Sequence, residues 1–99
     1  ICSGGIKLQL ESIEQRLQTA LDFPFVLTSV EDQTLGESLA MLYEGSHAPE
    51  DIRMRCKACL NKYEVPRHIL HTDKIPLTPT GKPARILAKQ LAKSIVKLP

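Results

Sequence analysis

Two strand-like segments separated by a short turn constrain the fold of this chain most strongly. Residues Phe25–Val30 are rich in aromatic and β-branched side chains, and residues 37–44 contain the apolar run Leu39–Tyr43. The segment Asp32–Gly36 between them has the composition of a turn. The two segments therefore predict an antiparallel β-hairpin.

Three amphipathic segments predict helices. The first covers residues 10–21 and is ended by Pro24, the second begins at Pro49 and ends at Val65–Pro66, and the third runs from about 84 to 95. Each has a single apolar face, which must lie on a sheet or on a partner surface. The side chains expected on these faces are Leu10, Ile13, Leu17, Ala20 and Leu21 in the first helix, Ile52, Cys56, Cys59, Leu60 and Tyr63 in the second, and Ile86, Leu87, Leu91 and Ile95 in the third.

Two further extended segments complete the predicted order of elements. Residues 1–9 form a short strand broken by Gly4–Gly5, and residues 67–73 form a third strand after the hairpin. The order strand, helix, strand, strand, helix, strand, helix predicts an α+β domain: a small two-layer α/β sandwich of an about three-stranded sheet and three helices. The 99 residues suffice for one core, so residues 1–99 form one domain. Because the chain starts at Ile1 within an element, we expect a fragment of a longer protein.

Composition excludes several classes of function. The formal net charge is only +2, which argues against nucleic acid as a partner. No apolar run approaches the roughly 20 residues that span a bilayer, so no membrane association is expected. Three cysteines without a secretory signal indicate a reducing, cytoplasmic location. The chain also lacks a recognisable pattern of nucleophile and histidine, and the phosphate-loop spacing around Gly81-Lys82 is missing.

The pair Cys56 and Cys59, followed by His68 and His71, suggests zinc at first sight. However, the spacing between the cysteines and the histidines fits a zinc site poorly. Both cysteines also fall on the apolar face of the second helix, where thiols pack as small hydrophobic groups. The sequence therefore predicts no metal site.

The segment Thr78–Arg85 places a lysine on a tight loop before the last helix. Pro79 fixes its own φ angle, and Gly81 allows the backbone to turn sharply. The ammonium of Lys82 is thereby held at the tip of a loop, where a lysine usually meets phosphate or carboxylate. An ordinary surface turn with a solvated lysine is the alternative at this point.

Two other features could bind ligands. Ser3-Gly4-Gly5 would let the backbone lie flat against a ligand or another strand, or it is an ordinary turn. Basic residues also recur every three or four positions along the last helix, which indicates a solvated face or a surface for a polyanion or an acidic partner. These residues are Lys82, Arg85, Lys89, Lys93 and Lys97.

Three motifs, in order along the chain, carry a family resemblance. Ser3–Leu8 with Ile13-Glu14, then Tyr63–Arg67, and finally Ile75–Arg85 resemble motifs of the C-terminal domain of adenylate-forming enzymes. The resemblance covers the whole chain and is greater to acyl- and aryl-CoA synthetases than to carrier-loading adenylation domains. Within that branch, residues 4–14 are most similar to the o-succinylbenzoate–CoA ligases of menaquinone biosynthesis.

This resemblance implies a two-step ligase reaction. A small carboxylate attacks the α-phosphate of ATP to form an acyl-adenylate, and the thiol of CoA then displaces AMP. The resemblance assigns Lys82 as the catalytic lysine, with Thr80, Gly81 and Arg85 in the substrate and nucleotide loop. It assigns Ser3, Gly4 and Gly5 to the CoA tunnel, which these residues enter after a rotation of the domain.

The resemblance also implies what lies outside these residues. ATP and CoA are expected as substrates, with Mg²⁺ accompanying ATP but without a metal ligand from this chain. The expected partner is a large N-terminal domain of the same protein, so the fragment alone should be inactive. Two departures stand out, because Ile6 and Pro83 replace a glutamate and an aliphatic residue of many relatives. The alternatives are a carrier-protein-loading adenylation domain and a non-catalytic binding module that docks its basic C-terminal helix on an acidic partner.

Overall fold

The chain folds into an α+β domain in the predicted order of elements. The computed structural model describes residues 2–3, 6–32, 36–82 and 84–96. The first predicted strand is divided in two, and Gly4 and Gly5 between its halves lie outside the described residues. The elements are β1 (Cys2–Ser3), β2 (Ile6–Lys7), α1 (Leu10–Gln18), β3 (Phe25–Asp32), β4 (Gly36–Tyr43), α2 (Pro49–Cys59), β5 (His68–His71) and α3 (Arg85–Val96).

Strand β4 lies in the middle of the sheet. It pairs antiparallel with β3 from Phe25 opposite Tyr43 to Asp32 opposite Gly36, which confirms the predicted hairpin. On its other side it pairs in parallel with β5, and Tyr43 lies opposite His71. The residues 33–35 of the predicted turn are outside the described part. The short β1–β2 ribbon joins this three-stranded unit through Ser3, which lies opposite Gly36.

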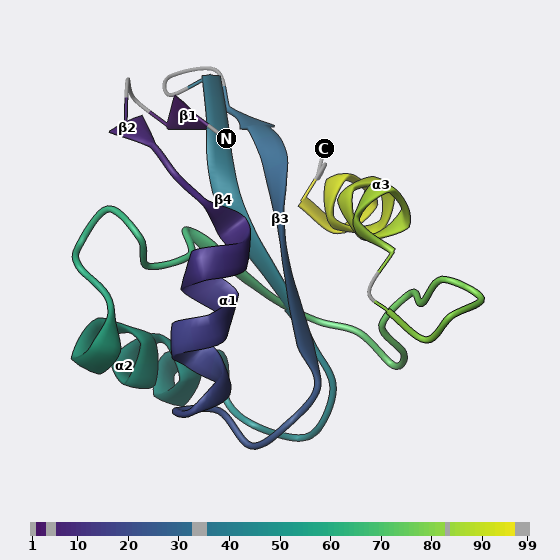
Figure 1. The fold of residues 1–99 in the computed structure, drawn as a ribbon, viewed down its shortest axis with the longest axis horizontal. Coiled ribbons are helices and arrows are strands. Elements are labelled where there is room, and N and C mark those ends of the chain that lie inside the picture. Colours follow the sequence, from purple (N-terminus) through teal and green to yellow (C-terminus); the bar gives the residue numbers. More distant parts are fainter. Residues whose placement is uncertain (1, 4–5, 33–35, 83, 97–99) are drawn as a thin grey trace.

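The helices cover both faces of the sheet (Figure 1). Helices α1 and α2 lie against one face and α3 lies against the other. The α+β class is confirmed, but the sheet forms a central layer between two helix layers and not one half of a two-layer sandwich. The physical reason is the apolar character of both faces of β3 and β4, since buried side chains alternate between the two cores along each strand.

Each core has its own set of buried side chains. Under α1 and α2 these are Leu8, Ile13, Leu17, Leu21, Leu27, Leu39, Met41, Tyr43, Ile52, Cys56, Leu60 and Ile69. Under α3 they are Val26, Val30, Ala40, Leu42, Ile75, Ala88 and Ala92.

The second helix starts as predicted but ends early. Pro49 occupies its first turn, with two acidic residues beside it. Its last residue is Cys59, because Leu60 adopts an extended backbone, with φ −123° and ψ 155°. Asn61 then accepts hydrogen bonds from the backbone N–H groups of Tyr63 and Glu64, which forms a separate turn. The prediction that Tyr63 lies on the buried helix face was therefore wrong, and its side chain is 53% exposed.

The third helix is placed as predicted but turned about its axis. Its fully buried residues are Ala88 and Ala92, whereas Ile86 is 77% exposed and Leu87 is 50% exposed. The prediction that Ile86 and Leu87 point inward was wrong. Leu91 and Ile95 do pack against the core. Two alanines let the helix backbone lie close to the sheet, where larger side chains would hold it away.

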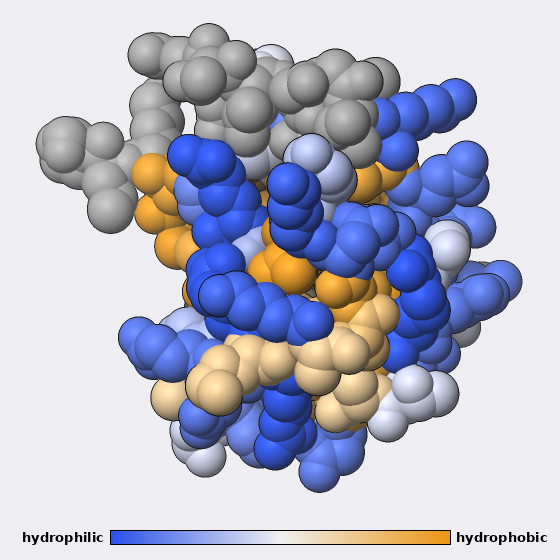
Figure 2. Space-filling view, turned by 90° about the vertical axis from the view of Figure 1, so that its left-hand side faces the viewer, coloured by the Kyte–Doolittle hydropathy of each residue, from blue (hydrophilic) through white to orange (hydrophobic). Residues whose placement is uncertain are grey.

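The face that carries α1 and α2 is largely hydrophilic, with a band of more apolar side chains across its middle (Figure 2). The exposed large hydrophobic residues of the domain include Met54 of α2. Within the described residues, none of the helices is both long and apolar enough to span a bilayer.

An ion pair ties α1 to the turn that follows α2. Arg16 donates from Nη1 to Glu64 Oε1 at 2.8 Å and from Nη2 to Oε2. These hydrogen bonds hold the pKa of the Glu64 carboxyl below its ordinary value of 4.5. The ion pair therefore favours the ionised form of the Glu64 carboxyl.

The packing of α3 can be tested by two substitutions with opposite expectations. Ala92→Leu should lower the free energy of unfolding by about 1–3 kcal/mol, because it overpacks a closed contact. Ile86→Ala should change it by less than about 0.5 kcal/mol, because this side chain lies in solvent. Urea unfolding of the 99-residue chain measures both values. A loss above about 2 kcal/mol for Ile86→Ala would instead place Ile86 in the core.

The Arg16–Glu64 pair predicts a pH-dependent contribution to stability. A carboxyl with a lower pKa in the folded than in the unfolded state stabilises the fold above its unfolded pKa. That contribution is lost as the pH falls through the folded pKa. We expect Glu64→Gln to lower the urea midpoint at neutral pH and to have little effect well below pH 4.5. Asp73→Asn, at an exposed position, is the control, and an equal effect of Glu64→Gln at both pH values would contradict the assignment.

Candidate active site

The loop before α3 is a small hairpin. The N–H of Thr78 donates to the carbonyl of Lys82 at 2.7 Å, and the N–H of Gly81 donates to the carbonyl of Thr78 at 2.8 Å. Gly81 has a φ of +84°, in the left-handed region that glycine adopts most easily. Pro79 follows Thr78, where its fixed φ suits the turn. This is the pattern of a three-residue hairpin loop closed by a left-handed glycine.

Threonine side chains stiffen this hairpin. The hydroxyl oxygen of Thr78 accepts a hydrogen bond from the Lys82 N–H at 3.2 Å and lies 2.9 Å from the hydroxyl oxygen of Thr80. The backbone at Lys82 is therefore held at both its N–H and its carbonyl group. The Lys82 side chain itself is exposed.

Carboxylates hold the two ends of the loop, one directly after β4 and the other on α1. At the first end, Ile75 is buried and its N–H donates to Glu44 Oε2 at 2.8 Å. At the second end, Ala84 donates from its N–H to the carbonyl of Pro76 at 2.9 Å, which closes the base of the hairpin. Arg85 follows at the start of α3 and is the second attachment.

Arg85 forms a bidentate ion pair with Glu14 of α1. Its Nη2 donates to Glu14 Oε1 at 2.5 Å and its Nη1 donates to Glu14 Oε2 at 2.9 Å. Nη1 also donates to the carbonyl of Leu27 in β3 at 2.8 Å, while the Leu27 N–H donates to Glu14 Oε2 at 2.9 Å. The hydrogen bonds to Glu14 raise the pKa of the Arg85 guanidinium.

The basic residues of the last helix divide into paired and unpaired groups. Lys89 Nζ lies 3.4 Å from Glu37 Oε2, and the same oxygen accepts a hydrogen bond from the Ser29 hydroxyl at 2.9 Å. The Ser29 hydroxyl and then Lys89 lower the pKa of Glu37. Arg85 and Lys89 both form ion pairs within the domain. Part of the basic stripe along the last helix, which was expected to be solvated, is therefore already paired. Among the described residues, no acidic side chain forms an ion pair with Lys82.

Ser3, the described residue of the predicted Ser3-Gly4-Gly5 feature, lies at a different end of the molecule from Lys82. Ser3 belongs to β1 and lies opposite Gly36 at one end of the β3–β4 hairpin, whereas residues 76–82 lie beyond the lower part of α3 (Figure 1). Gly4 and Gly5, which were predicted to line a CoA tunnel, lie outside the described residues. In this structure, β1 and the lysine loop are therefore not parts of one continuous site.

The surroundings of the two cysteines of α2 suit a structural role. Cys56 is fully buried, and this burial raises the pKa of its thiol to about 11. Cys59 donates weakly to backbone carbonyls of its own helix. Across the described ranges, no group of three or more His, Cys, Asp and Glu side chains is arranged to hold a metal ion.

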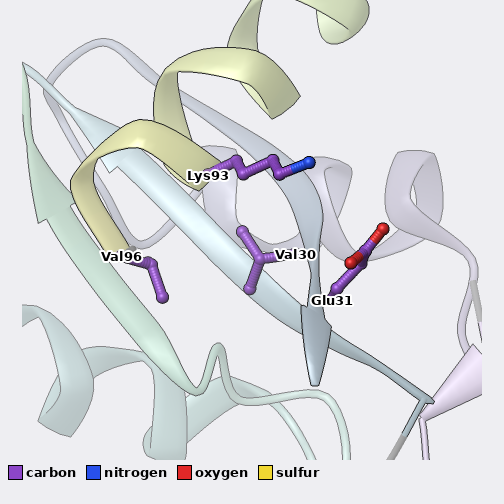
Figure 3. A pocket seen from close by; sticks show the side chains of 4 residues that line it. All are labelled: Val30, Glu31, Lys93 and Val96. Carbon is purple, nitrogen blue, oxygen red and sulfur yellow. The ribbon is translucent and has the colours of Figure 1, made fainter. Parts of the chain in front are cut away.

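A shallow cleft of about 410 Å³ lies between α3 and the end of β3 (Figure 3). It is lined by Val30, Glu31, Lys93 and Val96, and the charged ends of Lys93 and Glu31 extend toward the same side of it. None of these residues belongs to the motifs that carry the family resemblance. We therefore place the candidate active site at Lys82 and not in this cleft.

Glu14 and Glu44 hold the two ends of the lysine loop, and the sequence did not identify either as a site residue. Glu14 was named only as part of a family motif, and Glu44 only as the end of the predicted strand 37–44. The only available signal was the position of Glu14 within the motif Ser3–Glu14. Its contact with Arg85 joins residues 71 positions apart, which a local pattern cannot show.

No family model matches the chain, but curated proteins do. It is 37% identical over 90 residues to the medium-chain acyl-CoA ligase ACSF2, mitochondrial, of Danio rerio, covering 83% of this chain and 14% of that protein. It is also 36% identical over 97 residues to the polyketide synthase PksN of Bacillus subtilis, covering 90% of this chain and 2% of that protein. The chain thus spans only a small part of these relatives.

Solved structures of other proteins contain a domain with the same fold as this chain. The crystal structure of an acyl-CoA synthetase (AMP-forming)/AMP-acid ligase II-like protein from Dyadobacter fermentans matches with a TM-score of 0.79 and 25% identity. The match covers 94% of this chain and 29% of that one. Some neighbours, at 16% to 19% identity, have ATP bound, and their likeness shows the fold alone. Homologues and structural neighbours together show a C-terminal domain of the adenylate-forming, AMP-binding acyl-CoA synthetase family.

Gly81 offers a test of the loop geometry. A Cβ added at this position would meet nothing within 4 Å, so the cost of Gly81→Ala comes from its φ of +84° alone. We expect a local destabilisation of about 1–2 kcal/mol, measured by amide hydrogen exchange at Thr78 and residue 81. Gly81→Asn is the control, because asparagine tolerates this region better. Equal effects of the two variants would show that φ does not control the loop.

Proposed function

We propose that this domain is the mobile C-terminal part of an ATP-dependent acid–CoA ligase. The observation that carries the proposal is the Lys82 ammonium, exposed on a hairpin that is attached at both ends. Other cations near it in the sequence, such as Arg85 and Lys89, are paired within the domain. An exposed lysine with a held backbone and no acidic partner among the described residues suits an anion supplied from outside the domain.

In the first half-reaction, an oxygen of the substrate carboxylate attacks the α-phosphorus of ATP. The bond from the α-phosphorus to the bridging oxygen breaks, and pyrophosphate leaves with that electron pair. Lys82 donates hydrogen bonds to the oxygens on which negative charge develops, and so stabilises the transition state more than the ground state. Thr80 and Gly81 shape the loop, and Arg85 anchors it. The described residues offer no group of metal ligands, so we assign no step to Mg²⁺ on this domain.

In the second half-reaction, the sulfur of CoA attacks the acyl carbonyl carbon and AMP leaves. We propose that the domain rotates between the two steps, bringing Ser3, Gly4 and Gly5 to the pantetheine tunnel. The separation of β1 from the lysine loop supports this, because one placement of the domain cannot present both ends at the same point (Figure 1). Glycine suits the wall of a narrow tunnel, since a Cβ would obstruct it.

Exposed apolar side chains around Lys82 support a large partner surface within the same protein. Leu77 precedes the turn, and Ile86 and Leu87 follow it in the first turn of α3. All three are at least half exposed in the domain by itself. We propose that the N-terminal domain covers them when Lys82 reaches the nucleotide, so the isolated chain should lack ligase activity.

For the acyl substrate we propose o-succinylbenzoate, with menaquinone biosynthesis as the setting. The support is the similarity of residues 4–14 to that group of ligases, and Cys56 and Cys59 as free thiols suit a reducing cytoplasm. A panel of carboxylates offered to the full-length enzyme tests the assignment. A marked preference for a medium-chain fatty acid would replace it with the substrate class named for the Danio rerio relative.

The second candidate is a domain that loads an acyl group onto a carrier protein. The observation that favours it is the match to a polyketide synthase over 90% of this chain. Thioester formation on a carrier but not on free CoA would select this function. The non-catalytic module with a basic docking helix has less support, because Arg85 and Lys89 already bind acids of the domain.

The role of Lys82 is tested by measuring the half-reactions separately in the full-length enzyme. Lys82→Ala should slow adenylate formation by about 10²–10³-fold, as removal of one preorganised donor typically does. Thioester formation from supplied acyl-adenylate should be nearly unchanged. Pyrophosphate release and CoA consumption report the two steps.

Gly5→Val is the matched variant for the second half-reaction, thioester formation with CoA. It should slow thioester formation and leave adenylate formation intact, because it adds bulk only on the proposed CoA side. An equal loss of both half-reactions in Lys82→Ala would refute the proposed role of the lysine. A normal thioester rate in Gly5→Val would remove only the CoA assignment.

A further inference from the structure

The contact of Glu14 with Arg85 is more complete than a surface ion pair. The Glu14 side chain is 13% exposed, and both its oxygens accept hydrogen bonds from the guanidinium. The carbonyl and the N–H of Leu27 close the arrangement, one accepting from Arg85 and the other donating to Glu14. The guanidinium is therefore held in position and orientation relative to a buried strand.

The location of this contact connects it with the lysine. Arg85 is the first residue of α3 and lies three positions after Lys82. The hairpin is closed on itself by the backbone hydrogen bonds of Thr78 and Gly81 and by the bond from Ala84 to Pro76, and the carbonyl of Ala84 accepts from the N–H of Ala88 in α3. Its orientation relative to the sheet then depends on its two ends, the Ile75–Glu44 hydrogen bond and the Glu14–Arg85 pair.

We propose that Glu14 is a positioning residue for adenylate formation, which acts on Lys82 through Arg85. The inference rests on the proposed function and adds to it a residue on a different helix. Glu14 sets where α3 begins, and α3 sets where the hairpin places the lysine ammonium. A displacement of about 1 Å at a reacting group can lower a rate by about 100-fold. The Glu14–Arg85 pair should therefore affect the rate of adenylate formation as well as the stability of the domain.

The test uses Glu14→Gln in the full-length enzyme. Glutamine has nearly the same shape but only one acceptor oxygen, so it cannot receive both guanidinium hydrogen bonds and that of the Leu27 N–H. Adenylate formation should fall by about 10- to 100-fold, mainly in kcat, with thioester formation from supplied adenylate retained. Arg85→Lys should have the same effect, because an ammonium group cannot replace the planar guanidinium. This variant provides the test if Glu14→Gln does not fold.

A double-mutant cycle with Lys82 shows whether the effect passes through the lysine. In the Lys82→Ala background, Glu14→Gln should cause little further loss of adenylate formation, since no ammonium remains to be positioned. The matched control is Glu64→Gln in the turn after α2, which breaks a comparable bidentate pair with Arg16 of α1, away from the loop. It should leave the adenylation rate unchanged.

The outcomes separate the two proposals. If Lys82→Ala slows adenylation but Glu14→Gln does no more than Glu64→Gln, the inference about Glu14 fails and the proposed function stands. The inference also fails if Glu14→Gln has its full effect without Lys82, or if it slows both half-reactions equally. If Lys82→Ala itself leaves adenylation intact, the proposed function fails.

Discussion

The arrangement of this domain depends on the contact between Glu14, Arg85 and the backbone of Leu27. It joins α1 on one face of the sheet to α3 on the other, across β3. Strand β3 pairs only with β4 among the described strands, and an edge strand leaves peptide groups that need partners. The ion pair satisfies both peptide groups of Leu27 and is itself stabilised by them. Removing one member would leave the other charge and the peptide groups without their partners.

The cations of the C-terminal region differ in whether they have an acidic partner within the domain. Arg85 is committed to Glu14, and Lys89 to the site formed by Glu37 and Ser29. Lys82 projects from a hairpin that the same ion pair anchors, and within the described residues it forms no ion pair. The domain thus neutralises Arg85 and Lys89 and leaves Lys82 exposed on a stiff loop. This distribution suits a group that meets an anionic substrate on another domain.

Much of the fold could be predicted because its signals are local. The β3–β4 hairpin, the helix start at Pro49 and the turn at Gly81 all follow from residue types within a few positions. The buried face of α3 could not be predicted in the same way. Apolar residues surround most of that helix, so periodicity allows more than one face, and the sheet selects the side with Ala88 and Ala92. Tyr63 was misplaced because Asn61 formed a local turn that competed with the helix.

The sequence alone determined the order of elements, the α+β class, the glycine turn before Lys82 and the motifs that resemble adenylate-forming enzymes. These properties depend on backbone preferences and on spacing along the chain, so a single sequence contains them. Only the tertiary structure decided that helices cover both faces of the sheet, that Arg85 meets Glu14, and that Lys82 remains unpaired among the described side chains. Those outcomes depend on which distant residues approach within hydrogen-bonding distance, and that is set by packing of the whole domain.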